Sequence, residues 1–329
     1  MKSIKKNRFK IYNFFQNQIY SNSKIKKFTK IQIKKIFNVN NTSIINKLHS
    51  FAKRLSFLEL NQKQANIEFH RVKKLINNIH DKSSKKRLPI WNEGWNENYS
   101  NILKKGLSQG TIPGYYLRKN QRIFKLNNSK LIYPKSRDFE LLFHRLILHF
   151  INLKFLKEIN AIYEFGSGSC QNLIFFLKHN KKIKVFGSDW ADSSIKILKL
   201  IKKKYQKRFI SFKKINMFKK FSLNIIDNSC LFTYCSMEQL GKNFKNFLNS
   251  SIKLNFKLYI HIEPINELSA KDKFGILSSK YIKKRNYLSG FLTYLMKIEK
   301  KKIIKILYKD KIIGNSFFDC WSVIVWKKI

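Results

Sequence analysis

The stretch that most constrains the fold is an apolar run that ends in a glycine-rich turn, AIYEFGSGSCQNL at residues 161–173. A strand that passes through such a turn into a helix brings backbone N–H groups close to a nucleotide-like ligand. Gly166 and Gly168 can adopt positive φ and have no Cβ, so a ligand can approach the backbone closely. Glu164, at the end of the strand, would place an acceptor in the same crevice. The sequence therefore predicts an α/β fold with a ligand crevice at this turn.

Two cofactor classes use a turn of this kind, and the spacing separates them. A dinucleotide fingerprint, G-x-G-x-x-G, needs a glycine where this chain has Gln171. The order Glu164-x-Gly166-x-Gly168 instead resembles the first motif of class I S-adenosylmethionine-dependent methyltransferases, E/D-x-G-x-G-x-G, with Cys170 at the place of the third glycine. The resemblance covers a little over half of the chain and implies S-adenosylmethionine as the cofactor.

A second motif follows in IKVFGSDW, residues 183–190, which predicts a strand that ends in a carboxylate. Its distance from Glu164 fits two adjacent strands joined by one helix. The resemblance implies that Asp189 accepts hydrogen bonds from both ribose hydroxyls and that Trp190 lies beside the adenosine. The alternative is that Asp189 caps a helix, although Asp192 or Ser193 would fill that position better.

A third strand is expected over residues 209–215, and Asn216 and Met217 follow it. The resemblance implies that Asn216 bonds the edge of the adenine and that Met217 lies on the ring, and the alternative is an ordinary turn. The predicted cofactor-binding residues are Glu164, Gly166, Gly168, Asp189, Trp190, Asn216 and Met217.

The rest of the chain continues the alternation of strands and helices. Strands are expected at 230–235 and 257–262, a helix at 278–297, and an antiparallel pair at 303–308 and 320–326 separated by residues 309–315. The predicted fold class is α/β with a doubly wound, mostly parallel sheet. The resemblance implies seven strands in the order 3-2-1-4-5-7-6, as in class I methyltransferases, with a helical N-terminal region.

Acidic residues are scarce, 19 against 68 lysines and arginines, so their positions are informative. Glu164, Asp189, Glu238 and Glu263 each fall at or just beyond the carboxyl end of an expected strand, where open α/β sheets bind ligands. Methyl transfer to a hydroxyl needs a proton acceptor at this edge. His261 is the predicted base, with Glu238 and Glu263 nearby, and the alternative for His261 is a core histidine bonded to backbone groups. No cysteine or histidine spacing predicts a metal site.

Three regions are expected: a basic helical region at 1–86, an aromatic connector at 87–138 and a methyltransferase-type domain at 139–329. The connector contains Trp91 and Trp95, which could cover an acceptor pocket. Pro89, Pro113 and Pro134 predict turns there and no long helix. A helix over 139–156 would lead into the first strand.

The formal net charge of +49 favours polyanionic partners, namely RNA, DNA or an anionic membrane face. The alternative is a genomic base bias, because Lys, Asn, Ile and Phe all have A/T-rich codons. Nucleic acid is thus a second partner to consider, through the basic region at 1–86.

The segment 11–16 after the basic residues 1–6 is too short and polar for a signal-peptide core. No run reaches about 18 apolar residues, so no transmembrane helix and a cytoplasmic location are expected. The sequence leaves the oligomeric state open.

Proline placement argues against two nucleic-acid subclasses of the resembled family. None of the four prolines precedes another proline or a cysteine, so the motifs of amino-methylating and cytosine C5 enzymes are absent. The predicted function is S-adenosylmethionine-dependent methylation of a small hydroxylated acceptor, such as a sugar or a cell-envelope intermediate. The alternatives are an RNA methyltransferase and an inactive basic RNA- or membrane-binding protein on the same fold.

Overall fold

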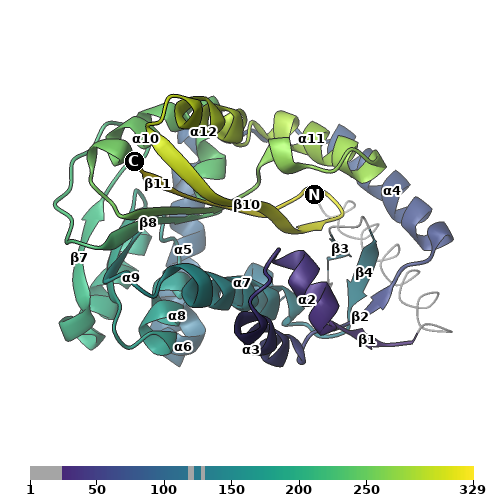
Figure 1. Ribbon diagram of the computed structural model, residues 1–329, viewed down its shortest axis with the longest axis horizontal. Coiled ribbons are helices and arrows are strands. Elements are labelled where there is room, and N and C mark those ends of the chain that lie inside the picture. Colours follow the sequence, from purple (N-terminus) through teal and green to yellow (C-terminus); the bar gives the residue numbers. More distant parts are fainter. Residues whose placement is uncertain (1–23, 118–121, 127–129) are drawn as a thin grey trace.

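The computed structural model describes residues 24–117, 122–126 and 130–329, and the expectations for residues 1–6 and 11–16 lie outside them. A single sheet lies between two layers of helices (Figure 1). The strands are β1 (Lys26–Lys27), β2 (Ser56–Glu59), β3 (Phe124–Lys125), β4 (Leu131–Pro134), β5 (Ala161–Phe165), β6 (Lys184–Asp189), β7 (Phe209–Lys214), β8 (Ser229–Tyr234), β9 (Leu258–Glu263), β10 (Ile304–Asn315) and β11 (Trp321–Lys328). The α-helices are α2 (Lys30–Ile36), α3 (Thr42–Ala52), α4 (Gln62–Asn77), α5 (Leu88–Lys105), α6 (Leu107–Gly110), α7 (Phe139–Phe155), α8 (Gln171–His179), α9 (Asp192–Lys204), α10 (Phe244–Lys253), α11 (Lys273–Arg285) and α12 (Phe291–Lys300).

Over the described residues the sheet is mixed and has eleven strands in the order β1-β2-β4-β3-β10-β11-β9-β8-β5-β6-β7. This corrects the expected sheet of seven, mostly parallel strands. Strands β7, β6, β5, β8 and β9 pair in parallel, and the remaining pairs are antiparallel. The four additional strands come from residues before 135. They extend the sheet because the far end of β10 leaves an open edge, where Gly314 and Asn315 pair with β3.

Helices cover both faces of the parallel strands. Alternate residues of β5 show this, since Ile162 packs in one apolar cluster with α7, α8 and α9, while Tyr163 packs in the other with α10 and α12. Parallel strands buried on both faces have nearly continuous apolar sequences, which is why the central strands were predictable. No helix in the described part of the chain is both long and apolar enough to cross a bilayer.

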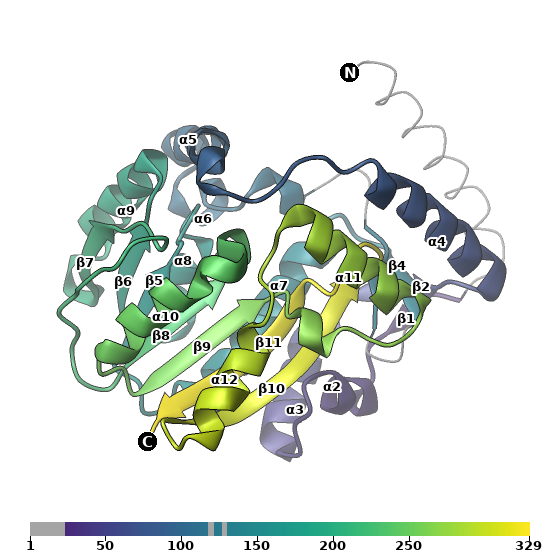
Figure 2. The same cartoon turned by 90° about the horizontal axis from the view of Figure 1, so that it is seen from above.

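The segment expected to form turns after residue 87 contains the 18-residue helix α5. Pro89 does not break it because it lies in the first turn, where a backbone N–H has no partner within the helix. The helix ends at Gly106, with φ at +75°. Figure 2 shows α5 beside α9, so it covers the carboxyl edge of the sheet.

Two other expected elements need correction. The helix expected over 278–297 is two helices, α11 and α12, because Asn286 (φ +52°) and Gly290 (φ +78°) turn the chain between them. The closing antiparallel pair is present, but β10 continues through the residues expected as its loop, 309–315. The turn lies at 316–320 instead.

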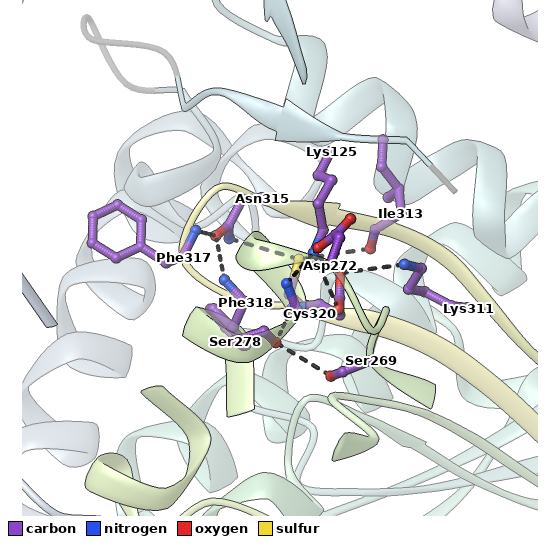
Figure 3. Close-up of polar contacts among 12 residues, drawn as sticks. Lys125, Ser269, Asp272, Ser278, Lys311, Ile313, Asn315, Phe317, Phe318 and Cys320 are labelled. Carbon is purple, nitrogen blue, oxygen red and sulfur yellow. Dashed lines mark hydrogen bonds and ion pairs between the residues drawn. The ribbon is translucent and has the colours of Figure 1, made fainter. Parts of the chain in front are cut away.

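A buried ion-pair cluster holds this turn. Asp319 and Lys125 are completely buried, and Lys125 Nζ lies 3.1 Å from Asp319 Oδ1. Lys311 Nζ lies 3.7 Å from the same oxygen. Figure 3 shows Lys125 and Lys311 approaching the turn that contains Phe318 and Cys320. The cluster thus connects β3, from the N-terminal part of the chain, to the closing hairpin.

We expect Asp319→Ala to lower the free energy of unfolding by about 3 kcal/mol or more, because it leaves the buried Lys125 ammonium without its carboxylate. Urea denaturation measures this loss. Glu158→Ala is the control, because the Glu158 side chain is 82% exposed in its ion pair with Lys257 and exposed pairs contribute only about 0–1 kcal/mol. Equal effects of the two substitutions would contradict a stabilising role for the buried cluster.

Candidate cofactor and acceptor site

The turn between β5 and α8 has three residues in the left-handed backbone region. Gly166, Gly168 and Cys170 have φ of +76°, +52° and +62°. Cys170, at the position where the resembled motif has its third glycine, therefore adopts a conformation that glycine takes at no steric cost. Its side chain is completely buried.

Close approach also requires the two glycines. A Cβ on Gly166 would lie 2.3 Å from Ser236 Cβ, and one on Gly168 would lie 2.8 Å from Trp95 Cζ2. The first contact comes from the segment after β8 and the second from α5. The turn is therefore enclosed from two sides, and any larger residue would push these segments away.

Hydrogen bonds fix the turn to the end of β6. The N–H groups of Gly166 and Ser167 donate to Ser188 O at 2.8 and 2.9 Å. Gly168 N donates to Asp189 Oδ2 at 2.8 Å, and Ala191 N donates to Asp189 Oδ1 at 2.9 Å. Burial raises the pKa of Asp189, and these backbone donors oppose the rise. The side chains of Asp192 and Ser193 do not cap α9, and Ser193 bonds Asn92 of α5 instead.

Glu164 lies behind the turn with its side chain completely buried. Its Oε1 accepts from Asn172 Nδ2 at 2.7 Å, while Oε2 has no partner among the described residues. Burial, with the Asp189 charge adding to it, raises the pKa of Glu164 to about 8. With this pKa the carboxyl group keeps its proton at neutral pH, which avoids a buried charge next to Asp189.

A chain of hydrogen bonds runs from Glu164 to the other end of the site. Burial lowers the pKa of His144 to about 3, so its imidazole is neutral. Asn172 donates its amide to Glu164, which leaves its Oδ1 to accept from His144 Nε2 at 2.8 Å. The His144 Nδ1 then accepts from the Tyr116 hydroxyl at 3.0 Å. Four buried side chains are thereby held in fixed positions.

A cavity of about 330 Å³ opens at the carboxyl ends of the parallel strands. The turn side is lined by Trp91, Trp95, Gly166, Ser167, Gly168, Ser169, Gln171, Asn172, Asp189, Trp190, Ile215, Met217 and Phe218. The opposite side is lined by Tyr115, Tyr116, Arg122, Glu140, His144, Tyr234, Cys235, Glu238, Gln239, Leu240, Tyr281, Tyr287, Phe318, Cys320 and Trp321. Ser236 also lines the cavity and lies against Gly166 of the turn. Both connector tryptophans thus line the cavity, on its turn side.

Six of the predicted site residues line this cavity, namely Gly166, Gly168, Asp189, Trp190, Met217 and Glu238. Four do not, namely Glu164, Asn216, His261 and Glu263. Asn216 Oδ1 accepts from Phe218 N at 2.9 Å, which stabilises the turn after β7. Phe218 lies beside Trp190, with ring centroids 5.8 Å apart.

Glu238 is the predicted catalytic residue that reaches the cavity. It lies in the 3-10 helix Met237–Asn243, and its Oε1 accepts from Gln239 Nε2 at 2.8 Å. Burial, followed by the neighbouring Glu263, raises the pKa of Glu238 to about 8. Glu263 lies beneath and accepts N–H bonds from Ser236, Met237 and Glu238, each at 3.1 Å. Glu263 therefore shapes the backbone that presents Glu238.

His261 lies away from the cavity, on the face of β9 that packs against α12. Its ring contacts Phe291 and Trp326, with centroids 5.1 and 6.1 Å away, and its Nδ1 is 3.0 Å from Thr233 Oγ1. Burial lowers the pKa of His261 to about 3. The structure therefore places His261 in the core, but its Nδ1 partner is a threonine hydroxyl and its Nε2 has no partner among the described residues, where the alternative interpretation expected backbone groups.

Sequence reasoning missed several residues of the site. His144 and Tyr116 gave no signal, because they lie in apolar or aromatic surroundings that are typical of core positions. Asn172, in the first turn of the helix after the glycines, and Tyr234, at the carboxyl end of the fourth predicted strand, could have been found by position. The described residues contain no group of three or more His, Cys, Asp or Glu side chains that could hold a metal ion.

No family model and no curated protein matches this sequence. Solved structures similar to this chain include small RNA methyltransferase HEN1, at 13% identity and a TM-score of 0.44, covering 56% of this chain and 25% of that one. The O-methyltransferase NcsB1, solved with S-adenosylmethionine and a hydroxylated naphthoic acid, gives 10% identity, a TM-score of 0.39 and 58% coverage of both chains. The S-adenosylmethionine-dependent methyltransferase SibL has 11% identity and a TM-score of 0.40, and the match covers 71% of this chain and 69% of that one. This chain therefore spans a quarter of HEN1 and over half of NcsB1, and its neighbours are of the class that its motifs resemble.

We expect Glu238→Gln to stabilise the protein at pH 8.5 relative to pH 5. The folded-state pKa of Glu238 is raised to about 8 from 4.5, so the folded protein binds this proton more tightly than the unfolded chain does. The stability that the proton contributes is complete below about pH 4.5 and is lost as the pH rises through about 8. Glutamine cannot ionise, so the variant avoids the loss. Thermal unfolding of both proteins across this range measures the difference, and a constant difference would contradict the burial of an ionisable Glu238.

Proposed function

We propose that this chain is a methyltransferase that transfers a methyl group from S-adenosylmethionine to a small hydroxylated acceptor. The observation that supports the proposal best is the enclosed glycine turn, with Asp189 and Glu238 at opposite sides of one cavity. The strands β5 to β11 lie in the order β7-β6-β5-β8-β9-β11-β10, which corresponds to 3-2-1-4-5-7-6 and fits the class I methyltransferase arrangement implied by the motifs. In this proposal residues 139–329 form the methyltransferase unit, and α5 of the connector covers its cofactor site.

The residues at the turn fit this cofactor. The Asp189 carboxylate lines the cavity, and a carboxylate oxygen can accept more than one hydrogen bond, so it can bind ribose hydroxyls as well as Gly168 N and Ala191 N. Glu164 is absent from the cavity lining and would act indirectly, by holding Asn172, which does line it. Trp190 and Met217 offer apolar surfaces to an adenine ring. Asn216 would act indirectly, through the turn that carries Met217.

S-adenosylmethionine supplies an electrophilic methyl group on a sulfonium, and transfer of this group leaves a neutral thioether. On the acceptor the hydroxyl oxygen forms the new C–O bond as the C–S bond breaks, and its proton must be removed. Glu238 replaces His261 as the proposed proton acceptor, since of the three predicted catalytic residues it is the one that lines the cavity. Glu263 positions it through the three backbone N–H groups.

We expect Asp189→Ala to weaken binding of S-adenosylhomocysteine at least tenfold in calorimetry, because the variant loses both the ligand contacts and the anchor of Gly168 N. Asp192→Ala is the matched control, because this carboxylate is three residues away and 67% exposed in an ion pair with Lys214. Similar affinity of both variants, or tight binding of NAD with no response to the thioether ligand, would contradict the cofactor assignment.

We expect methyl transfer to increase with pH with an inflection near 8, because Glu238 accepts the proton only when ionised and its pKa is raised to about 8. Glu238→Gln should lower the rate about a hundredfold or more and remove the inflection. The assay uses a radiolabelled methyl group and cell extract fractionated into RNA, protein and small-molecule pools. Label chiefly in RNA would favour an RNA acceptor and contradict the small-molecule choice.

A further inference from the structure

We propose that the acceptor is a planar aromatic compound that carries a hydroxyl group, and that the site discriminates against saccharides. This inference rests on the proposed function and concerns the side of the cavity opposite the turn. It follows from the shape of the walls and from the small number of polar groups that remain free to bind a ligand.

Aromatic rings from several parts of the chain form the walls of this side. Tyr281 of α11 stacks on Phe318 of the closing turn, with centroids 4.7 Å apart and an angle of 20°. Tyr234 of β8 meets Trp321 of β11 edge to face at 6.3 Å. Tyr116 packs against His144, with centroids at 5.0 Å. Flat rings of this kind favour a flat guest, which they can contact by stacking or by edges.

These walls rest on a rigid support. Asn315 Oδ1 accepts from the N–H groups of Phe317 and Phe318 at 2.8 and 3.1 Å, and Ser278 Oγ accepts from Asp319 N at 3.0 Å (Figure 3). The buried Lys125 and Lys311 hold Asp319 from the other side. The Phe318 wall is therefore held in place from both ends of the turn before a guest enters.

Most polar side chains on this side are already bonded to one another. Tyr116 is bonded to His144, and Arg122 Nη1 donates to Glu140 Oε1 at 3.1 Å. Gln239 uses both ends of its amide, accepting from Ser83 Oγ and donating to Glu238, each at 2.8 Å. A saccharide would bring several hydroxyls into this space, and those left unpaired would oppose binding.

Among the described residues on this side, Tyr234 and Glu238 are two polar groups that can bind an acceptor. Tyr234 is 7% exposed and its hydroxyl has no partner among the described residues. Burial raises the pKa of Tyr234 well above its ordinary value, so the hydroxyl stays neutral and can donate. Glu238 has one oxygen that no described side chain occupies. Tyr234 can donate to the oxygen of the same hydroxyl whose proton Glu238 accepts, so these two groups match an acceptor with one reacting hydroxyl.

The acidity of the reacting hydroxyl also favours a phenol over a saccharide as the acceptor. A phenol ionises near pH 10, close to the pKa of about 8 of Glu238. A saturated alcohol is about as weakly acidic as water, near 15.7. In the transfer step the phenolic oxygen bonds the methyl carbon, the C–S bond breaks, its electron pair stays on sulfur, and the phenolic proton passes to Glu238. A carboxylate base suits this step better than deprotonation of a sugar.

The test begins with the protein saturated with S-adenosylhomocysteine, so that binding is read without turnover. 1-Naphthol should raise the melting temperature further and bind in calorimetry, and methyl glucoside and cyclohexanol should do neither. Tyr234→Phe should weaken naphthol binding roughly fivefold, the size of one lost hydrogen bond. Tyr205→Phe is the matched control, because Tyr205 follows α9 and does not line the cavity.

Turnover with S-adenosylmethionine gives the second readout. Glu238→Gln should lower the rate strongly with 1-naphthol and much less with 4-nitrophenol, which ionises without a base. Binding or methylation of methyl glucoside in preference to the phenols, or no response to any phenol while S-adenosylhomocysteine binds, would overturn the inference and leave the proposed function standing. Failure of S-adenosylhomocysteine to bind would overturn both.

Discussion

The structure of the site depends on the bond from Gly168 N to the Asp189 carboxylate. This bond, with the two from Gly166 and Ser167 to Ser188 O, fixes the glycine turn to the end of β6 and directs the start of α8. Positive φ at Gly166 and Gly168 permits the geometry, and the absence of Cβ atoms lets Ser236 and Trp95 approach. Because both β5 and β6 are buried central strands, the turn has a rigid base. The same carboxylate then faces the cavity, so one side chain serves both the fold and the proposed cofactor site.

The segment from β5 to β6 was predictable from the sequence because its elements are specified by local sequence patterns. An apolar run, a glycine turn and a carboxylate at the end of the next strand predicted β5, α8, β6 and the position of Asp189. Tertiary contacts decided the rest. Pro89 was interpreted as a sign of turns, yet it lies in the first turn of α5. The strands before residue 135 join the sheet through a short pairing with β10, which has no periodic pattern in the sequence. His261 lies at a strand end as predicted, but its side chain points to the α12 face, since residues along a strand alternate between faces.

The two sides of the cavity are connected through buried polar groups. Glu164, Asn172, His144 and Tyr116 form one chain of hydrogen bonds from behind the glycine turn to the aromatic walls. Buried networks of this kind stay in place only when each member is satisfied. Within this hydrogen-bonded network, Glu164 Oε2 has no partner among the described residues, and it lies behind the glycine turn. Tyr234 is unsatisfied at the acceptor end. Among the buried atoms of the described residues that have no partner, Tyr234 Oη and Trp91 Nε1 belong to residues that line the cavity.

The proposed function requires that the cavity at the glycine turn binds the cofactor. A crystal structure with S-adenosylhomocysteine tests it most directly. We expect ligand density between the turn and Trp190, with the ribose hydroxyls bonded to Asp189 and the thioether sulfur facing the side that holds Glu238. Density elsewhere on the protein, or a ligand in the cavity without contact to Asp189, would contradict the account.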